Sequence, residues 1–149
     1  MENSLKGLIL AAGTVITCLV ITLGFYLSKE AQATASTGTS QIGKINSEFA
    51  ENDKTMYDGV KVSGSEVINA IRKFEDDKMG ISVVTNTGQT FYGYAFNIDT
   101  GDLTIKNTNE YTDAISENDA SYINPYADFK GEVVRNANDV ITGIVFTQV

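Results

Sequence analysis

The feature that most constrains this chain is an uncharged, apolar run near its amino end. Leu8–Leu27 reads LILAAGTVITCLVITLGFYL and holds no charged side chain, while Lys29 and Glu30 follow closely after it. As a helix, these twenty residues rise about 30 Å, which matches the hydrocarbon thickness of a bilayer. The run is also longer than the apolar helices that small domains bury. It therefore predicts a permanent membrane anchor.

A cleaved secretory signal peptide is the competing interpretation of this run. Signal peptides have an apolar core of about 7–15 residues followed by a cleavage site between small residues. Ala31-Gln32-Ala33 and Ala33-Thr34-Ala35 both provide such a site. The length of the run favours the anchor, and the short flank before Gly7 favours a topology with the rest of the chain outside the cell.

Small or weakly polar residues form a stripe along the run. They follow one another at steps of four, three, four and four residues: Gly7, Ala11, Thr14, Cys18 and Thr22. This spacing places them on one helical face, where small side chains let two membrane helices approach closely. The stripe predicts packing against another copy of the chain. The alternative is chance, because such residues are common in membrane helices.

The sequence divides into three segments. Residues 1–28 form the predicted transmembrane and assembly helix, and residues 29–40 form either a flexible linker of small residues or a continuation of that helix. Residues 41–149 have the composition of a globular domain. Apolar residues recur at helical spacing where this domain begins: Ile42, Ile45, Phe49 and Met56. They predict an amphipathic helix over 41–55 that packs against the globular domain.

The rest of the globular domain predicts an α+β fold. Ser63 and Glu66 have the spacing of a capping box, which predicts a short second helix over 64–76. Period-two patterns follow at 81–85, 89–98, 102–107, 129–135 and 140–149, and short turns connect the first three and the last two. They predict an antiparallel β-meander of about four to five strands. In the second of these strands, alternation places Tyr92, Tyr94 and Phe96 on one face and Phe91 on the other.

A long polar and acidic segment separates the third and fourth predicted strands. Residues 107–128 contain Tyr111, Tyr122 and Tyr126 among acidic and amide side chains. Loops of this length in a small domain are usually functional or mobile. The segment is therefore a candidate ligand-binding loop.

The composition argues against several classes of function. The net charge is −8, with eleven basic residues against nineteen acidic ones, which argues against binding to nucleic acid. The chain has no histidine and one cysteine, so no metal site of these ligands is expected. Asp99-Thr100-Gly101 resembles an aspartic protease string, but that chemistry needs two converging carboxylates, and a hairpin turn is the expected structure. The acidic clusters lack the spacing of a calcium loop. We expect no catalytic residues and no cofactor.

The layout of the whole chain resembles that of type IV pilins and pseudopilins. In this family an apolar amino-terminal helix with an amphipathic extension precedes an antiparallel sheet. Lys6-Gly7-Leu8 is similar to the family's leader cleavage site, which places candidate cleavage between Gly7 and Leu8. Ala12 stands where the family has a glutamate. The resemblance implies a subunit whose apolar helices bundle inside a filament and whose globular domains lie outside.

Two functions are compatible with these observations. The first is a structural subunit of a surface filament or a pilus-like secretion apparatus, whose partners are membrane lipid and further copies of the chain. The second is a monomeric, single-pass ectodomain that binds a partner or ligand through 107–128.

Overall fold

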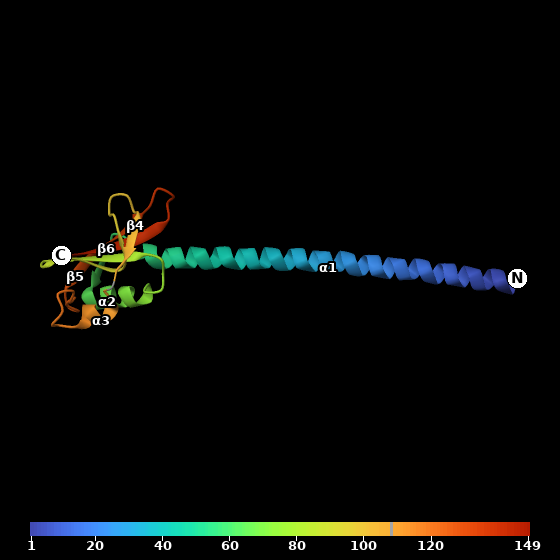
Figure 1. Cartoon of the computed structure of the whole chain (residues 1–149), viewed down its shortest axis with the longest axis horizontal. Helices are drawn as coiled ribbons and strands as arrows, with labels where there is room; N and C mark the ends of the chain where they lie inside the picture. Colours follow the sequence, from blue (N-terminus) through green and yellow to red (C-terminus); the bar gives the residue numbers. More distant parts are fainter. Residues whose placement is uncertain (108) are drawn as a thin grey trace. The chain divides into compact units, whose positions relative to one another are not determined.

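The computed structural model describes residues 1–107 and 109–149. The chain forms two compact units, Met1–Glu48 and Phe49–Val149, and we call the second unit the head. Helix α1 (Glu2–Thr55) forms nearly all of the first unit (Figure 1). Its last residues, 49–55, belong to the head. Residues 29–40 are helical throughout. In the described part of the chain, α1 is the one helix long and apolar enough to cross a membrane.

The head has the α+β fold that the sequence predicts. After α1, its elements in chain order are β1 (Lys61–Ser63), α2 (Gly64–Lys73), β2 (Gly80–Thr85), β3 (Gly88–Phe96), β4 (Leu103–Lys106), α3 (Tyr111–Ile115), β5 (Asp128–Arg135) and β6 (Ile141–Gln148). The strands form a six-stranded sheet in the order β1-β5-β6-β2-β3-β4. The five predicted strands are β2 to β6, and the three-residue β1 is an addition.

The sheet is mixed rather than purely antiparallel. The β2–β3–β4 meander and the β5–β6 hairpin are antiparallel, but β2 and β6 pair in parallel, with Ile81 opposite Ile144. These two strands are the centre of the sheet, where Val83 and Phe146 are also paired and almost fully buried. Central strands covered on both faces are nearly continuously apolar, as β6 is. The meander prediction is therefore corrected in how the two antiparallel parts join: β6 pairs in parallel with β2, and β4 does not pair with β5.

Two short helices cover one face of the sheet. Figure 1 shows α2 and α3 side by side on that face. The Ser63 and Glu66 capping box is confirmed: Glu66 N–H donates to Ser63 Oγ at 3.4 Å, and Ser63 N–H donates to Glu66 Oε2 at 3.1 Å. Val67, Ile71 and Phe74 of the α2 segment are buried in the main core against the sheet.

A smaller cluster covers the opposite face of the sheet and corrects one prediction. Phe96 packs with Phe91 there, with ring centroids 5.5 Å apart, whereas Tyr92 lies in the main core. Gly93 has φ 72°, and the β3–β4 register shifts between Tyr94 and Phe96. An irregularity of this kind reverses which face the following residues occupy. Strict alternation therefore misplaced Phe96.

Candidate assembly helix

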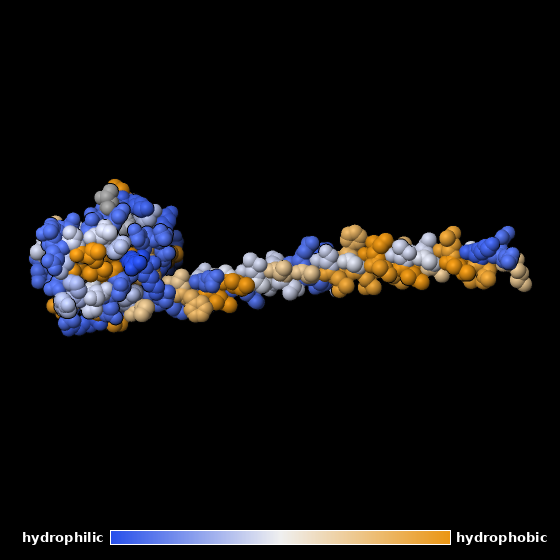
Figure 2. Space-filling model, turned by 90° about the horizontal axis from the view of Figure 1, so that it is seen from below, coloured by the Kyte–Doolittle hydropathy of each residue, from blue (hydrophilic) through white to orange (hydrophobic). Residues whose placement is uncertain are grey.

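The apolar part of α1 is almost entirely exposed. None of its residues is buried, and its large apolar side chains are 53–75 % exposed: Leu8, Ile9, Leu10, Val15, Ile16, Leu19, Val20, Ile21, Leu23, Phe25, Tyr26 and Leu27. Figure 2 shows this apolar surface along α1. Soluble monomers rarely expose a contiguous apolar surface of this extent. The segment therefore needs lipid or other protein around it.

The three threonine hydroxyl groups of this segment are satisfied within the helix. Thr14 Oγ1 donates to the Ala11 carbonyl at 2.8 Å, Thr17 Oγ1 to the Gly13 carbonyl at 2.8 Å, and Thr22 Oγ1 to the Cys18 carbonyl at 2.7 Å. A threonine bonded in this way needs no water. These threonines thus cost little when lipid or another helix covers them.

The predicted small-residue stripe lies on the exposed surface of α1. All five of its members are exposed: Gly7, Ala11, Thr14, Cys18 and Thr22. A shallow groove on the helix is lined by Lys6, Ile9, Leu10, Gly13, Thr14, Thr17 and Cys18. The groove contains two residues of the stripe and adds Gly13 and Thr17, which the sequence reasoning missed. The missed signal is Gly13-x-x-x-Thr17, a pair of small residues four apart.

The glycines of α1 have no role in packing within their own chain. A Cβ atom added at Gly7, Gly13, Gly24 or Gly38 would meet no atom within 4 Å among the described residues. Glycine inside a helix costs about 1 kcal/mol relative to alanine. A close neighbour along the helix would give these glycines a packing role.

The predicted packing residues after the apolar run are exposed. The exposed fractions are 61 % for Ile42, 49 % for Ile45, 66 % for Phe49 and 58 % for Met56. Phe49 and Met56 belong to the head, whose core does not include them. Tyr57 packs there instead, edge-on against Phe146 with ring centroids 5.6 Å apart. The packing of Ile42 and Ile45 stays a prediction.

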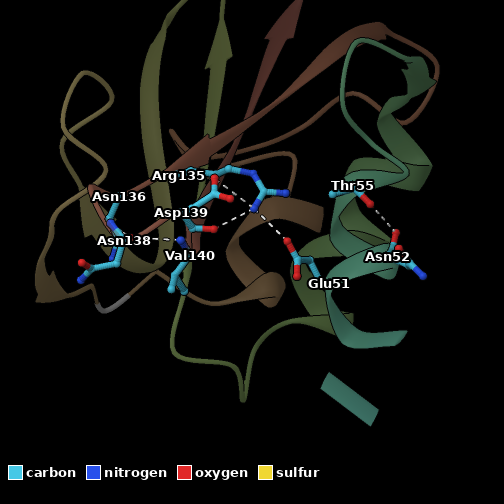
Figure 3. Close-up of polar contacts among 8 residues, drawn as sticks. All are labelled: Glu51, Asn52, Thr55, Arg135, Asn136, Asn138, Asp139 and Val140. Atoms are coloured by element: carbon cyan, nitrogen blue, oxygen red, sulfur yellow. Dashed lines mark hydrogen bonds and ion pairs between the residues drawn. The ribbon is translucent and has the colours of Figure 1, made fainter. Parts of the chain in front are cut away.

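Ion pairs tie the last turns of α1 to three parts of the head. Arg135 Nη1 donates to Glu51 Oε1 at 2.8 Å and to the Asp139 carbonyl at 2.8 Å (Figure 3). The hydrogen bond to Glu51 raises the pKa of Arg135 further above its usual range. Asp53 pairs with Lys73 in α2 at 2.9 Å, and Lys54 pairs at 2.9 Å with Asp77, which follows α2. The three ion pairs thus join residues 51–54 to three separate segments of the head.

The side chain of Asn136 holds the turn that provides the Asp139 carbonyl, the second hydrogen-bond acceptor of Arg135. Asn136 Oδ1 accepts hydrogen bonds from the backbone N–H groups of Asn138, at 3.0 Å, and Val140, at 3.1 Å. Figure 3 shows this turn beside Arg135 and Glu51. The β5–β6 turn therefore presents the Asp139 carbonyl to Arg135 in a defined position.

The three candidate loop tyrosines lie in different environments. Tyr111 begins α3 and packs against the main core, with Arg72 placed 5.7 Å from its ring centroid. Tyr126 is 94 % exposed. Tyr122 is half-buried and lines a groove between the β2–β3 hairpin and the 117–122 segment, with Thr85, Thr87, Gly88, Gln89, Thr90, Glu117, Asp119 and Ala120. The structure does not gather the tyrosines into one surface.

A hydrogen bond from Tyr92 in β3 joins the sheet to the segment around Ser121. The Tyr92 hydroxyl donates to the Ser121 carbonyl at 2.5 Å, and the tyrosine side chain is almost fully buried. Burial, followed by the charges of Asp113 and Asp119, raises the pKa of Tyr92 above its ordinary value. The buried Tyr92 hydroxyl therefore has a structural role.

The remaining chemical candidates lie in turns. Asp99-Thr100-Gly101 forms the tight connection between β3 and β4, where the Asn97 side chain accepts a hydrogen bond from Asp99 N–H at 2.9 Å. Among residues 1–107 and 109–149, no three side chains of His, Cys, Asp or Glu gather as metal ligands would.

Comparison with protein family models, curated proteins and solved structures finds no match for this chain.

Proposed function

We propose that this chain is a structural, non-catalytic subunit of a surface filament or a pilus-like secretion apparatus. The observation that carries the proposal is the exposed apolar part of α1, for which the described fold provides no cover. Assembly with membrane lipid and with further copies of the chain would cover it.

The length of α1 supports assembly over simple anchoring. A span of one bilayer needs about 20 residues, whereas α1 has 54 residues and rises about 80 Å. A tether has no need for the additional helical turns. A subunit that packs side by side with its neighbours uses them as contact surface.

The order of the elements is similar to that of pilin-like subunits. An apolar amino-terminal helix precedes a small sheet, and the last turns of the helix are bonded into the head. In such an assembly the helices lie inside and the heads outside. The candidate cleavage between Gly7 and Leu8 belongs to this proposal.

The test compares full-length chain with a double variant, Thr14→Leu and Cys18→Leu, in a mild detergent. Both substitutions keep the helix apolar but fill the small-residue stripe, so we expect association to weaken about tenfold. Ile16→Leu, on another face of the same segment, is the matched control and leaves association unchanged. Equal association of all three proteins would show that the stripe has no role in assembly.

The groove beside Tyr122 supports a second candidate, an anchored ectodomain that binds a ligand. The groove is lined by threonine hydroxyls, the Glu117 and Asp119 carboxylates and the Tyr122 side chain. Such a site suits a polar, uncharged or cationic ligand. If Glu117→Ala with Tyr122→Ala left every interaction of the head intact, this candidate would lose its surface.

A further inference from the structure

A pocket of about 290 Å³ lies in the head, between the end of α2, β3 and the segment that follows β4. Its floor consists of side chains that are only 2–6 % exposed: Ile71, Phe74, Met79, Ile81 and Tyr92. Its rim consists of charged and amide side chains that are exposed or partly exposed. The pocket shares no lining residue with the groove beside Tyr122, so the two are separate places on the head.

Hydrogen bonds hold the wall of this pocket in place. Asn107 N–H donates to the Gly93 carbonyl at 2.6 Å. The side-chain amides of Asn107 and Asn109 both donate to the Phe91 carbonyl, at 2.8 Å and 3.2 Å. The segment after β4 is therefore bonded to β3 beside the pocket, and Gly93 lines it without a side chain that could fill it. A cavity held in this way is formed before a ligand arrives, as most small-molecule sites are.

The volume of the pocket limits what can occupy it. A water molecule takes up about 30 Å³ of the liquid, so the pocket has room for about ten waters or for a molecule of similar size. A stable protein partner needs roughly 800 Å² of surface on each side, which is far more than this opening offers. The pocket therefore suits a small molecule.

Carboxylates predominate among the charged residues of the rim. Glu75, Asp76 and Glu110 line the pocket together with one basic residue, Lys106, so the lining has a net charge of −2. In the part of the chain that the structure describes, none of these three carboxylates forms an ion pair. Opposite charges attract most strongly where the surroundings exclude water. The rim therefore favours a cationic ligand over an anionic one.

The floor adds a requirement for an apolar body. The rings of Phe74, Tyr92 and Tyr111 line the pocket, and a further aromatic ring packs well against such rings edge-on or offset. Arg72 lies 5.7 Å from the Tyr111 ring centroid but is not a lining residue, so Lys106 is the one cation among the described lining residues. A ligand that suits both floor and rim has an aromatic ring and one ammonium group.

We propose that this pocket binds a small aromatic amine, whose ring lies on the buried floor and whose ammonium group faces the carboxylates of the rim. The site is independent of assembly through α1. It would serve a filament subunit and an anchored ectodomain equally.

The test titrates the full-length chain in mild detergent with three ligands of the same shape and different charge: phenethylamine, 2-phenylethanol and phenylacetate. The chain has three methionines, whose methyl groups are labelled with carbon-13 for NMR. Met79 in the floor reports on the pocket, and Met56, which is 58 % exposed and does not line it, is the internal control. We expect phenethylamine to shift the Met79 signal to saturation and to bind about tenfold or more tightly than 2-phenylethanol. Phenylacetate should leave the signal in place.

A pair of double variants tests the contribution of the rim. Glu75→Gln with Asp76→Asn removes two rim carboxylates while keeping their shape, and should weaken phenethylamine binding about tenfold. The matched control is Glu117→Gln with Glu132→Gln, which removes the same charge from exposed positions outside the pocket. It should change the affinity less than about twofold.

Three results would each overturn the inference. One is a Met79 signal that no ligand shifts. Another is an equal response to all three ligands or at Met56 as well, which would show partition into the detergent rather than binding. The third is equal weakening by the two double variants, which would show attraction by the overall charge of the head or binding beside Tyr122. None of these results bears on assembly, so the proposed function would stand.

Discussion

An alanine methyl group at Gly80 would overlap the carbonyl oxygen of Tyr94 on the neighbouring strand. At Gly43 in α1, the same methyl would meet no described atom within 4 Å. At the residue scale, the head therefore has a glycine, Gly80, where two backbones approach closely. In the first unit, no close neighbour requires a glycine at position 43.

This contrast predicts opposite effects of two identical substitutions. Gly80→Ala should lower the free energy of unfolding of the head by about 2 kcal/mol or more, because the strand must shift to admit the methyl group. Gly43→Ala should leave the unfolding of the head unchanged, since it only improves helix propensity. Urea denaturation of the full-length chain measures both, and an equal effect of the two would refute the packing described for Gly80.

Tyr92 gives a second prediction at this scale. Tyr92→Phe removes the hydrogen bond to the Ser121 carbonyl and should cost about 1 kcal/mol at neutral pH. Burial raises the pKa of Tyr92 in the folded state, so its stabilisation is complete below the ordinary tyrosine pKa of about 10 and declines as the pH rises above it. The stability difference between the two proteins should therefore shrink at alkaline pH in denaturation experiments. A difference that stays constant up to pH 11 would contradict this assignment.

At the element scale, the end of α1 is part of the head. Glu51, Asp53 and Lys54 pair with Arg135, Lys73 and Asp77, which lie on three separate segments. Single exposed ion pairs contribute about 0.2–1 kcal/mol each, so their combined effect is local rather than global. They keep residues 51–54 of α1 from fraying.

Removing one of these pairs should loosen the helix end selectively. Arg135→Gln should speed amide hydrogen exchange within 49–55 severalfold and lower the unfolding free energy by about 1 kcal/mol or less. Lys61→Gln, which breaks the exposed pair with Asp128 on β1 and β5, is the matched control. If both variants exchanged at 49–55 like the unaltered chain, the pair with Glu51 would not hold the helix end.

The elements that local signals specify could be predicted from the sequence. The Ser63 and Glu66 capping box set the start of α2, and the tight turns set the strand bounds of β2, β3 and β4 to within two residues. The parallel pairing of β2 with β6 could not be predicted, because spacing along the chain does not specify which distant strands become neighbours. The irregularity at Gly93 was missed because it breaks a local alternation, and β1 because it has three residues.

The candidate site was predictable in part for the same reason. Leu8–Leu27 and the small-residue stripe follow from composition and helical spacing alone, whereas the groove also depends on side chains beside the stripe, among them Gly13 and Thr17. Exposure of Phe49 and Met56 could not be read from their spacing, because an amphipathic pattern specifies a partner surface without saying which chain provides it.

At the scale of the whole molecule, charge and apolar surface are separated between the two units. The head holds eight basic and sixteen acidic residues and thus the entire net charge of −8, while Met1–Glu48 is neutral. A neutral, apolar helix associates without charge repulsion, and acidic heads keep an assembled surface soluble. This separation suits a subunit with an interior helix and an exterior head.

Electron microscopy of native envelope preparations, labelled with an antibody against the head, tests the central claim most directly. We predict filaments or pilus-like structures that carry the label along their surface, and their loss when Thr14→Leu and Cys18→Leu are combined. Label confined to a smooth envelope, together with a monomeric chain in mild detergent, would contradict it.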